Sequence, residues 1–249
     1  MEKRGTAADT VAVPRKIKMN IPKISKRLLA AASFVREGVF VADVGTDHAY
    51  LPIYLYKTGK IAGGVASDIN KGPVERAMEN ILSYGADKKI SVVLTDGLRK
   101  IEEYSPDDVM ILGMGGELIV KILSEAPWVK NKKYRLILQP MTHPEITRKY
   151  LYENGFSIVD ECIVDDEKIY QIICAEHSGK IEEITNVSEC ELMFGKLNIE
   201  RRSELLFELL KRTKKVFEER IKGKQIAGAD SSEEEKMIKN IDMIINGEI

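Results

Sequence analysis

Residues 39–52, VFVADVGTDHAYLP, constrain the fold more than any other part of the chain. The stretch opens with an apolar run typical of a strand, passes through Asp43 and Gly45 to the polar pair Asp47-His48, and then becomes helical. A strand that ends in Asp-x-Gly and leads into a helix is how doubly wound α/β proteins build a nucleotide site. We expect backbone N–H groups of this turn to face a ligand, beside a carboxylate at the strand's carboxyl end.

Strand and helix patterns alternate along the first two thirds of the chain. Apolar runs predict strands at residues 39–41, 61–69, 90–94, 108–112 and 134–138, and helical spacing predicts helices at 25–35, 50–56, 73–84, 117–123 and 145–153. This alternation indicates a mainly parallel, doubly wound sheet. Residues 156–164 and 169–175 follow as a hairpin with no helix between them, so we expect an antiparallel last strand.

The pattern changes after residue 178. Residues 182–198 form a connector whose sequence pattern is weak, 199–221 predict a long amphipathic helix, and 232–245 predict a second helix that a Ser232–Glu235 capping box would start. We therefore divide the chain into a basic tail (1–20), an α/β domain (21–178) and a helical hairpin domain (179–249). The tail is interpreted as disordered, with an RNA-contacting arm as the alternative.

Composition excludes several classes of protein. The 38 Lys and Arg nearly balance the 39 Asp and Glu, so any nucleic-acid surface must be a local patch. The cysteines Cys162, Cys174 and Cys190 are widely spaced and lack paired histidines, which predicts neither a disulfide framework nor a metal site. No apolar run suits a membrane span or a signal peptide, so we expect a soluble, cytoplasmic protein, either a monomer or a weak dimer.

The first turn favours S-adenosylmethionine over a dinucleotide. A pyrophosphate needs G-x-G-x-x-G, but here only Gly45 is present and Asp47 stands where the second glycine would be. A carboxylate would repel a pyrophosphate. It would suit S-adenosylmethionine, because that cofactor carries a positive sulfonium and a positive amino group.

Further candidates follow the other strands in order. We expect Asp68 to accept hydrogen bonds from the ribose hydroxyls, Asp96 to receive the adenine amino group, and the glycine run 113–116 to admit the methionine part. Each alone is also explained as a helix cap or a tight turn, but the ordered series is not. The full set predicted to bind the cofactor is Asp43, Gly45, Asp47, His48, Leu51, Asp68, Ile69, Asn70, Asp96, Gly97, Gly113, Met114, Gly115 and Gly116.

Several of these stretches, taken together, resemble one family. SKRLLAAASFV, ADVGTDHAYLP, DGL, LGMGGELI, LILQP, ENGF and KIYQIICAE are similar to the bacterial tRNA (adenine-22-N1)-methyltransferases, known as TrmK. The resemblance implies a class I methyltransferase (Rossmann-like) domain, a coiled-coil-like helical domain, S-adenosylmethionine as cofactor, and methylation of adenine N1 in the D-arm region of tRNA. Where many members have Gln-Pro-Asn, this chain has Gln139-Pro140-Met141, so the asparagine's contact with the substrate cannot be carried over.

The expected chemistry is simple. Adenine N1 has a free lone pair, so catalysis should be mostly positioning, helped by an acceptor or anion near a base that becomes cationic. The candidate catalytic residues are Asp47, His48, Gln139 and Pro140, with Asp47 as the electrostatic partner and Gln139 as a base-edge contact. His48 is equally well explained as a helix-start residue that packs on the loop.

Substrate contacts are less specific. The target base must be exposed, and Tyr50 or Tyr54 could stack on it, although core packing explains both tyrosines better. Phosphate contacts are expected from cations of the helical hairpin domain, which a solvated helix face explains equally well: Arg201, Arg202, Lys211, Arg212, Lys214 and Lys215. Two alternatives stay open, a methyltransferase acting on another RNA or a small molecule, and a non-catalytic cofactor-binding scaffold.

Overall fold

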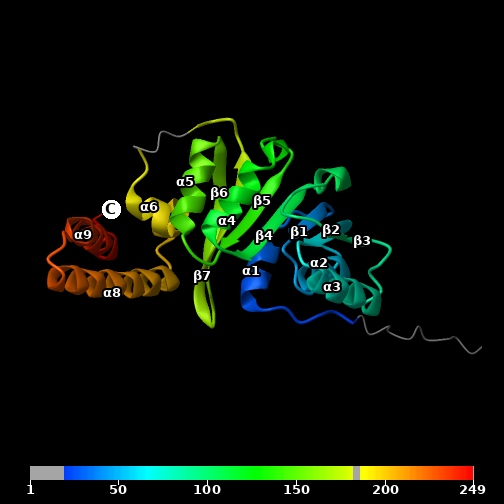
Figure 1. Ribbon diagram of the computed structural model, residues 1–249, viewed down its shortest axis with the longest axis horizontal. Coiled ribbons are helices and arrows are strands. Elements are labelled where there is room, and N and C mark those ends of the chain that lie inside the picture. Colours follow the sequence, from blue (N-terminus) through cyan, green and yellow to red (C-terminus); the bar gives the residue numbers. More distant parts are fainter. Residues whose placement is uncertain (1–19, 182–185, 249) are drawn as a thin grey trace, which may run out of the picture.

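A computed structural model describes residues 20–181 and 186–248. The predicted basic tail therefore lies outside the described residues, apart from Asn20. Seven strands form one sheet (Figure 1), and their bounds are β1 Phe40–Val44, β2 Gly63–Asp68, β3 Ile90–Leu94, β4 Asp108–Met114, β5 Arg135–Pro140, β6 Phe156–Asp166 and β7 Lys168–His177.

The strand order is β3-β2-β1-β4-β5-β7-β6. The pairs from β3 to β5 are parallel, whereas β7 runs antiparallel to both β5 and β6. The hairpin turns at Glu167, whose φ of +62° lies in the left-handed region. The predicted mainly parallel sheet with an antiparallel last strand is confirmed. The order reverses between β1 and β4, which is where open α/β sheets bind ligands.

Helices cover both faces of the sheet. One face packs against α1 (Lys26–Phe34), α2 (Tyr50–Lys57) and α3 (Lys71–Ser83), and the other against α4 (Gly116–Ser124) and α5 (Pro144–Glu153). Two short 3-10 helices, η1 (Glu102–Tyr104) and η2 (Pro127–Val129), lie on the α4 side. Ser25 caps α1 as predicted, because its hydroxyl accepts a hydrogen bond from the Leu28 N–H.

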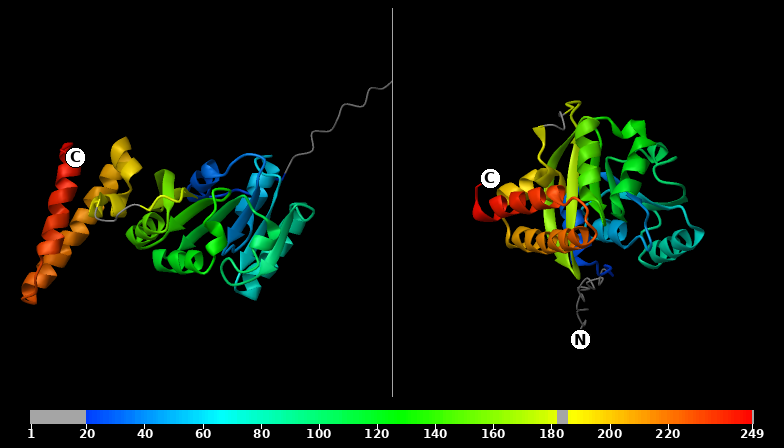
Figure 2. Two further views of the ribbon diagram at one scale, coloured as in Figure 1. Left: turned by 90° about the horizontal axis from the view of Figure 1, so that it is seen from above. Right: turned by 60° about the vertical axis from the view of Figure 1, so that its left-hand side comes forward.

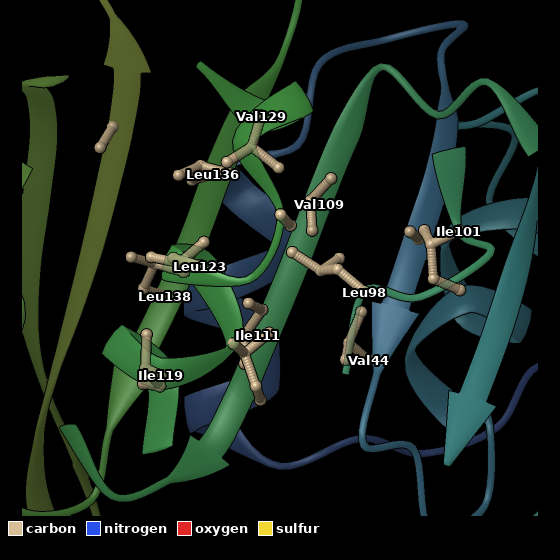
Figure 3. Packing of buried hydrophobic residues seen from close by; sticks show 14 of the residues in the cluster. Val44, Leu98, Ile101, Val109, Ile111, Ile119, Leu123, Val129, Leu136 and Leu138 are labelled. Atoms are coloured by element: carbon tan, nitrogen blue, oxygen red, sulfur yellow. The ribbon is translucent and has the colours of Figure 1, made fainter. Parts of the chain in front are cut away.

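Alternation along the strands produces the two cores. Successive residues of a strand point to opposite faces, so Val109 and Ile111 of β4 face α4 while Met110 between them faces α1 and α2. Figure 3 shows the α4-side core, in which strand side chains meet those of the helix; the labelled strand and α4 residues are Val44, Val109, Ile111, Leu136, Leu138, Ile119 and Leu123.

The segment predicted to be a connector is partly helical. Within it the structure contains α6 (Glu189–Phe194) and the beginning of α7 (Lys196–Arg201). A capping box starts α6: the Ser188 hydroxyl accepts from the Glu191 N–H, and the Glu191 carboxylate accepts from the Ser188 N–H. These helices are too short to show a clear apolar period, which explains why the sequence pattern of this segment is weak.

Two longer helices complete the chain as an antiparallel hairpin (Figure 2). They are α8 (Glu204–Ile226) and α9 (Ser232–Asn246). Lys214 pairs with Asp242, and Lys224 pairs with Glu234, so positions that ascend along α8 meet positions that descend along α9. The predicted Ser232 capping box is wrong: Ser231 is the N-cap, and its hydroxyl donates to the Glu235 carboxylate instead of capping the backbone.

The α8–α9 hairpin stands at the end of the sheet away from β3 (Figure 2). Together with α6 it forms a separate apolar core. Its buried side chains are Cys190, Phe194, Leu206, Leu210, Phe217, Met237, Ile241 and Ile244. Across residues 20–181 and 186–248, none of the helices is long and apolar enough to cross a bilayer. Cys162, Cys174 and Cys190 are free thiols, and burial raises the pKa of each.

A buried ionic network joins this helical region to the sheet. The fully buried Arg148 of α5 donates two hydrogen bonds to Glu161 of β6 and others to the Leu192 and Met193 carbonyls of α6. The second oxygen of Glu161 accepts the Leu197 N–H at the start of α7. Removing Arg148 or Glu161 would leave the other as an unpaired buried charge, so the pair is costly to break. Since the two side chains also bind the backbone of α6 and α7, they hold the start of the helical region against the sheet.

Candidate cofactor site

A cavity of about 350 Å³ lies at the carboxyl ends of β1 and β4, where the strand order reverses. Its size is in the range typical of small-molecule sites. The lining residues come from α1, the β1–α2 turn and the end of β4: Arg27, Leu28, Asp43, Gly45, Thr46, Asp47, His48, Ala49, Tyr50, Leu51, Leu112 and Gly113.

Asp43 is the buried acid of this cavity. Its side chain lies at the end of β1, and only 8% of the residue is exposed. Burial raises the pKa of Asp43 to about 6, although a hydrogen bond with the Thr46 side chain partly opposes the shift. A carboxyl group held in this way favours a ligand that brings a positive charge.

The turn after β1 is held by the neighbouring strand. The N–H groups of Gly45 and Thr46 both donate to the Ser67 carbonyl of β2, so the expectation that these two groups face a ligand is wrong. Gly45 has a φ of +79°, and a Cβ there would lie 2.1 Å from the Met114 side chain. The backbone conformation therefore favours glycine here, whereas the Met114 methyl group, at the end of a flexible side chain, could move aside.

Asp47 and His48 lie at the cavity's rim. The Asp47 carboxylate accepts a hydrogen bond from Arg76 of α3, which holds its pKa below the usual range, and it lies 3.1 Å from His48 Nε2. The Asp47 side chain is 63% exposed. The His48 ring stacks on Tyr50 with 5.2 Å between ring centroids. Asp47 therefore presents its carboxylate to solvent beside the cavity, already paired with one cation.

Arg27 lines the cavity but was not among the residues predicted to bind the cofactor. Its Nη1 donates to Gln139 Oε1 at 2.5 Å, and the same oxygen accepts the Gly113 N–H at 3.0 Å. The guanidinium also lies 5.4 Å from the centroid of the Tyr170 ring. Sequence reasoning assigned residues 25–35 to an amphipathic helix, and nothing in that pattern distinguishes Arg27 from a surface cation.

Gln139 and Pro140, proposed from sequence as substrate contacts, are buried. Gln139 has no exposed surface, and its Nε2 donates to the Pro140 carbonyl and to the Met141 sulfur. A base-edge contact from Gln139 would have to replace one of these bonds. In the structure Gln139 instead joins α1 to the ends of β4 and β5.

The predicted cofactor residues divide into two groups. Six of them line the cavity: Asp43, Gly45, Asp47, His48, Leu51 and Gly113. The rest do not: Asp68, Ile69, Asn70, Asp96, Gly97, Met114, Gly115 and Gly116. Asp68 and Asp96 nevertheless follow the carboxyl ends of β2 and β3, at the same edge of the sheet. Their contacts with a cofactor stay a prediction.

Two of the glycines in the second group have a packing reason. A Cβ on Gly116 would lie 2.3 Å from the His143 carbonyl oxygen, and the Gly116 N–H donates to the Thr142 carbonyl. Gly97 has a φ of +56°, and a Cβ there would press against Ile122. Close approach of backbone to backbone therefore explains Gly116 without a ligand.

The six cations of the helical domain that were predicted to contact phosphates are not equally free to do so. Arg201 pairs with Asp160, Lys214 with Asp242 and Arg212 with Glu208, while Arg202 donates to the last carbonyls of α9. Lys211 and Lys215 are exposed, and neither forms an ion pair within the described part of the chain. Tyr54 packs against the core as expected, whereas Tyr50 lines the cavity. Among the residues described, no group of His, Cys, Asp or Glu could hold a metal ion.

Comparison with known proteins shows that the chain is similar to methyltransferases. A methyltransferase-domain family model matches residues 24–173. The tRNA (adenine(22)-N(1))-methyltransferase of Bacillus subtilis is 39% identical over 159 residues, which are 64% of this chain and 67% of that protein. The chain belongs to the tRNA (adenine(22)-N(1))-methyltransferase family.

Solved structures of the same family extend the likeness into the helical region. The alignment with the structure of the B. subtilis m1A22 tRNA methyltransferase TrmK covers 88% of this chain and 94% of the TrmK chain. Its TM-score is 0.76, and the two sequences are 30% identical. The alignment with M. capricolum TrmK, solved in complex with S-adenosyl-homocysteine, covers 89% of this chain and 99% of the TrmK chain. Its TM-score is 0.73, and the two sequences are 26% identical.

Proposed function

We propose that the protein is an S-adenosylmethionine-dependent tRNA methyltransferase that modifies N1 of adenine 22. The family membership supports this function, and the observation that carries it in this chain is the buried carboxyl of Asp43 in a cavity at the switch point of the sheet. The same site and cavity would serve a methyltransferase with another substrate, so the tRNA assignment rests on the relatives.

The residues present fit the cofactor. S-adenosylmethionine supplies an electrophilic methyl group on a positive sulfonium, which the lone pair of adenine N1 can attack. Burial raises the pKa of Asp43, and the hydrogen bond with the Thr46 side chain offsets only part of that shift. The cofactor's positive amino group would further stabilise the ionised carboxylate. Asp68, at the end of β2, would accept hydrogen bonds from the ribose hydroxyls.

The chain's own contribution to the reaction is positioning and electrostatics. The N1 lone pair needs no general base, and the base becomes cationic as the methyl group arrives. Asp47 is the exposed one of the two carboxylates that line the cavity, and the pairing with Arg76 keeps it ionised. We assign to it the stabilisation of the methylated base, with His48 and Tyr50 as the aromatic side of the rim.

The tRNA would dock along the helical region. Lys211 and Lys215 are our candidates for phosphate contacts, because their charges are not already paired within the described residues. We therefore interpret residues 21–178 as the methyltransferase domain and 179–249 as a tRNA-docking domain. From a tRNA substrate we also infer that the protein acts in the cytoplasm.

Methyl transfer to a tRNA transcript by the purified protein tests this function. The matched control is Asp43→Asn, which removes the buried acid and should weaken cofactor binding while leaving the RNA surface unchanged. Cofactor binding by the wild-type protein without transfer to any tRNA would contradict the proposal and favour the scaffold alternative.

A further inference from the structure

A second cavity, of about 360 Å³, lies between the sheet and the helical hairpin. Its walls come from the loop after β5, the start of β7, the end of α6 and one side of α8. Its lining includes Met141, His143, Tyr170, Thr213, Phe217 and Arg220. Both parts of the chain are needed to form it, so its shape depends on how they are joined.

The walls of this second cavity are fixed by buried hydrogen bonds. Gln171 of β7 donates to the Met193 carbonyl of α6, and both residues line the cavity. Arg148 donates to Gln171 as well as to that carbonyl. The cavity is therefore preformed, which lowers the conformational cost of binding.

An arginine–tyrosine pair connects the walls of the second cavity and the cofactor cavity. Arg27 lines the first, Tyr170 lines the second, and the guanidinium lies over the tyrosine ring at 5.4 Å. Gln139 holds Arg27 in this position. A base in the second cavity would thus contact the tyrosine side of this pair, whereas the cofactor cavity lies on its arginine side.

The lining suits a nucleotide. Tyr170 and Phe217 offer aromatic surface, Met141 and Pro140 add apolar contacts, and a flat base can stack on such groups. Arg220 lies 5.3 Å from the Phe217 ring and has no ion pair among the residues described, so its charge is available for a phosphate. One carboxylate, that of Glu145, is also present, and it is paired with His143 at 2.9 Å.

We propose that this second cavity binds an unpaired nucleotide of the tRNA next to the target adenine, with its base against Tyr170 and Phe217 and its phosphate at Arg220. The proposal rests on the proposed function for the identity of the RNA. It extends that function by naming where the RNA is held while the neighbouring adenine enters the cofactor site.

Filling the cavity tests the proposal. Thr213→Trp would occupy it from α8, and Gln225→Trp puts the same side chain on the same helix outside the cavity. Thr213→Trp should raise the tRNA KM at least about fivefold, as expected for losing one base–aromatic stack, with the cofactor Kd unchanged. Equal tRNA KM values for the two variants would overturn the proposal.

A second pair of variants covers the case in which the bulky side chain disturbs folding. Arg220→Gln should weaken tRNA binding, measured by fluorescence anisotropy without turnover, several-fold more than Lys222→Gln, which removes the same charge from the same helix. Equal losses would contradict the phosphate contact. This measurement needs no methyl transfer, so its outcome is distinct from a failure of the proposed activity.

Cross-linking identifies the nucleotide. A benzophenone amino acid at position 213 should cross-link to a nucleotide adjacent to adenine 22 when tRNA is bound and irradiated. A cross-link to adenine 22 itself, or to a distant part of the tRNA, would overturn the assignment.

Discussion

Arg27 on α1 and Gln139 at the end of β5, 112 positions apart, are joined by a 2.5 Å hydrogen bond beside the cofactor cavity. The amide oxygen of Gln139 also accepts the N–H of Gly113. This one buried oxygen therefore joins the first helix to the ends of β4 and β5.

Replacing Gln139 distinguishes positioning from base recognition. Gln139→Leu should lower the free energy of unfolding by about 1–3 kcal/mol, because the Gly113 N–H and the Arg27 guanidinium lose their partner, and should weaken cofactor binding. Gln139→Glu keeps an acceptor for both donors. If Gln139 acts only by positioning, the Glu variant retains kcat; a large loss of kcat with normal stability would instead support the base-edge contact. Urea unfolding and steady-state kinetics measure both.

Asp43→Asn should stabilise the protein and weaken cofactor binding. The pKa of Asp43 is raised from 3.8 to about 6, so the protonated form stabilises the fold below pH 3.8 and that contribution is lost as the pH rises through about 6. At neutral pH the wild type therefore carries a destabilisation of up to about 3 kcal/mol that the Asn variant lacks. Thermal unfolding at pH 7.5 checks the direction, and a lower Tm for Asp43→Asn would contradict it.

The same group makes cofactor affinity depend on pH. A positive ligand prefers the ionised carboxylate, so the wild-type Kd for S-adenosylmethionine should rise by up to tenfold per pH unit below about pH 6. The Asn variant should bind more weakly at pH 7.5 and lose this dependence. Calorimetric titrations of both proteins between pH 5 and 8 measure it, and parallel curves would rule out Asp43 as the titrating group.

The sequence predicted the ordered strands well and the individual site residues less completely. The strand ends could be predicted because they depend on local sequence. Strand β1, for example, is buried and ends directly before Gly45, which has a positive φ. The role of Arg27 depends on contacts with β5 and β7 that no local pattern contains. Gly116 was assigned to a ligand, but it makes room for the His143 carbonyl from a loop that follows the next strand.

The helical region shows the same limit. Apolar spacing predicted the hairpin of α8 and α9, yet α6 is only six residues long and its capping box precedes too short a run to be recognised. The ion-pair partners of the cations in the helical domain could not be predicted from sequence. Asp160 reaches Arg201, and Asp242 reaches Lys214, only after the chain has folded.

Asp47→Asn tests the electrostatic role proposed for that residue. Removing the charge should lower kcat at saturating tRNA by about tenfold to a hundredfold, since the base becomes cationic during transfer. Arg76 keeps the pKa of Asp47 low, so the wild-type rate should not fall between pH 8 and 5 through protonation of this group. Unchanged turnover in Asp47→Asn would eliminate the assignment.

Charge reversal at Lys211 and Lys215 tests the docking surface. The double variant Lys211→Glu/Lys215→Glu should raise the tRNA KM and reduce the slope of log K against log salt by about 2, because two phosphate contacts are lost. Lys88→Glu/Lys89→Glu, at an exposed turn between α3 and β3, is the matched control and should leave both quantities close to wild type. The same response in the two variants would show that only overall charge matters.

The central claim is tested most directly with tritiated S-adenosylmethionine and unmodified tRNA transcripts that carry either adenine or guanine at position 22. The account predicts label in the adenine transcript alone, recovered as 1-methyladenosine after digestion. Label in both transcripts would move the target to another nucleotide. No label in either, with cofactor binding intact, would contradict a tRNA methyltransferase and favour another substrate or a scaffold.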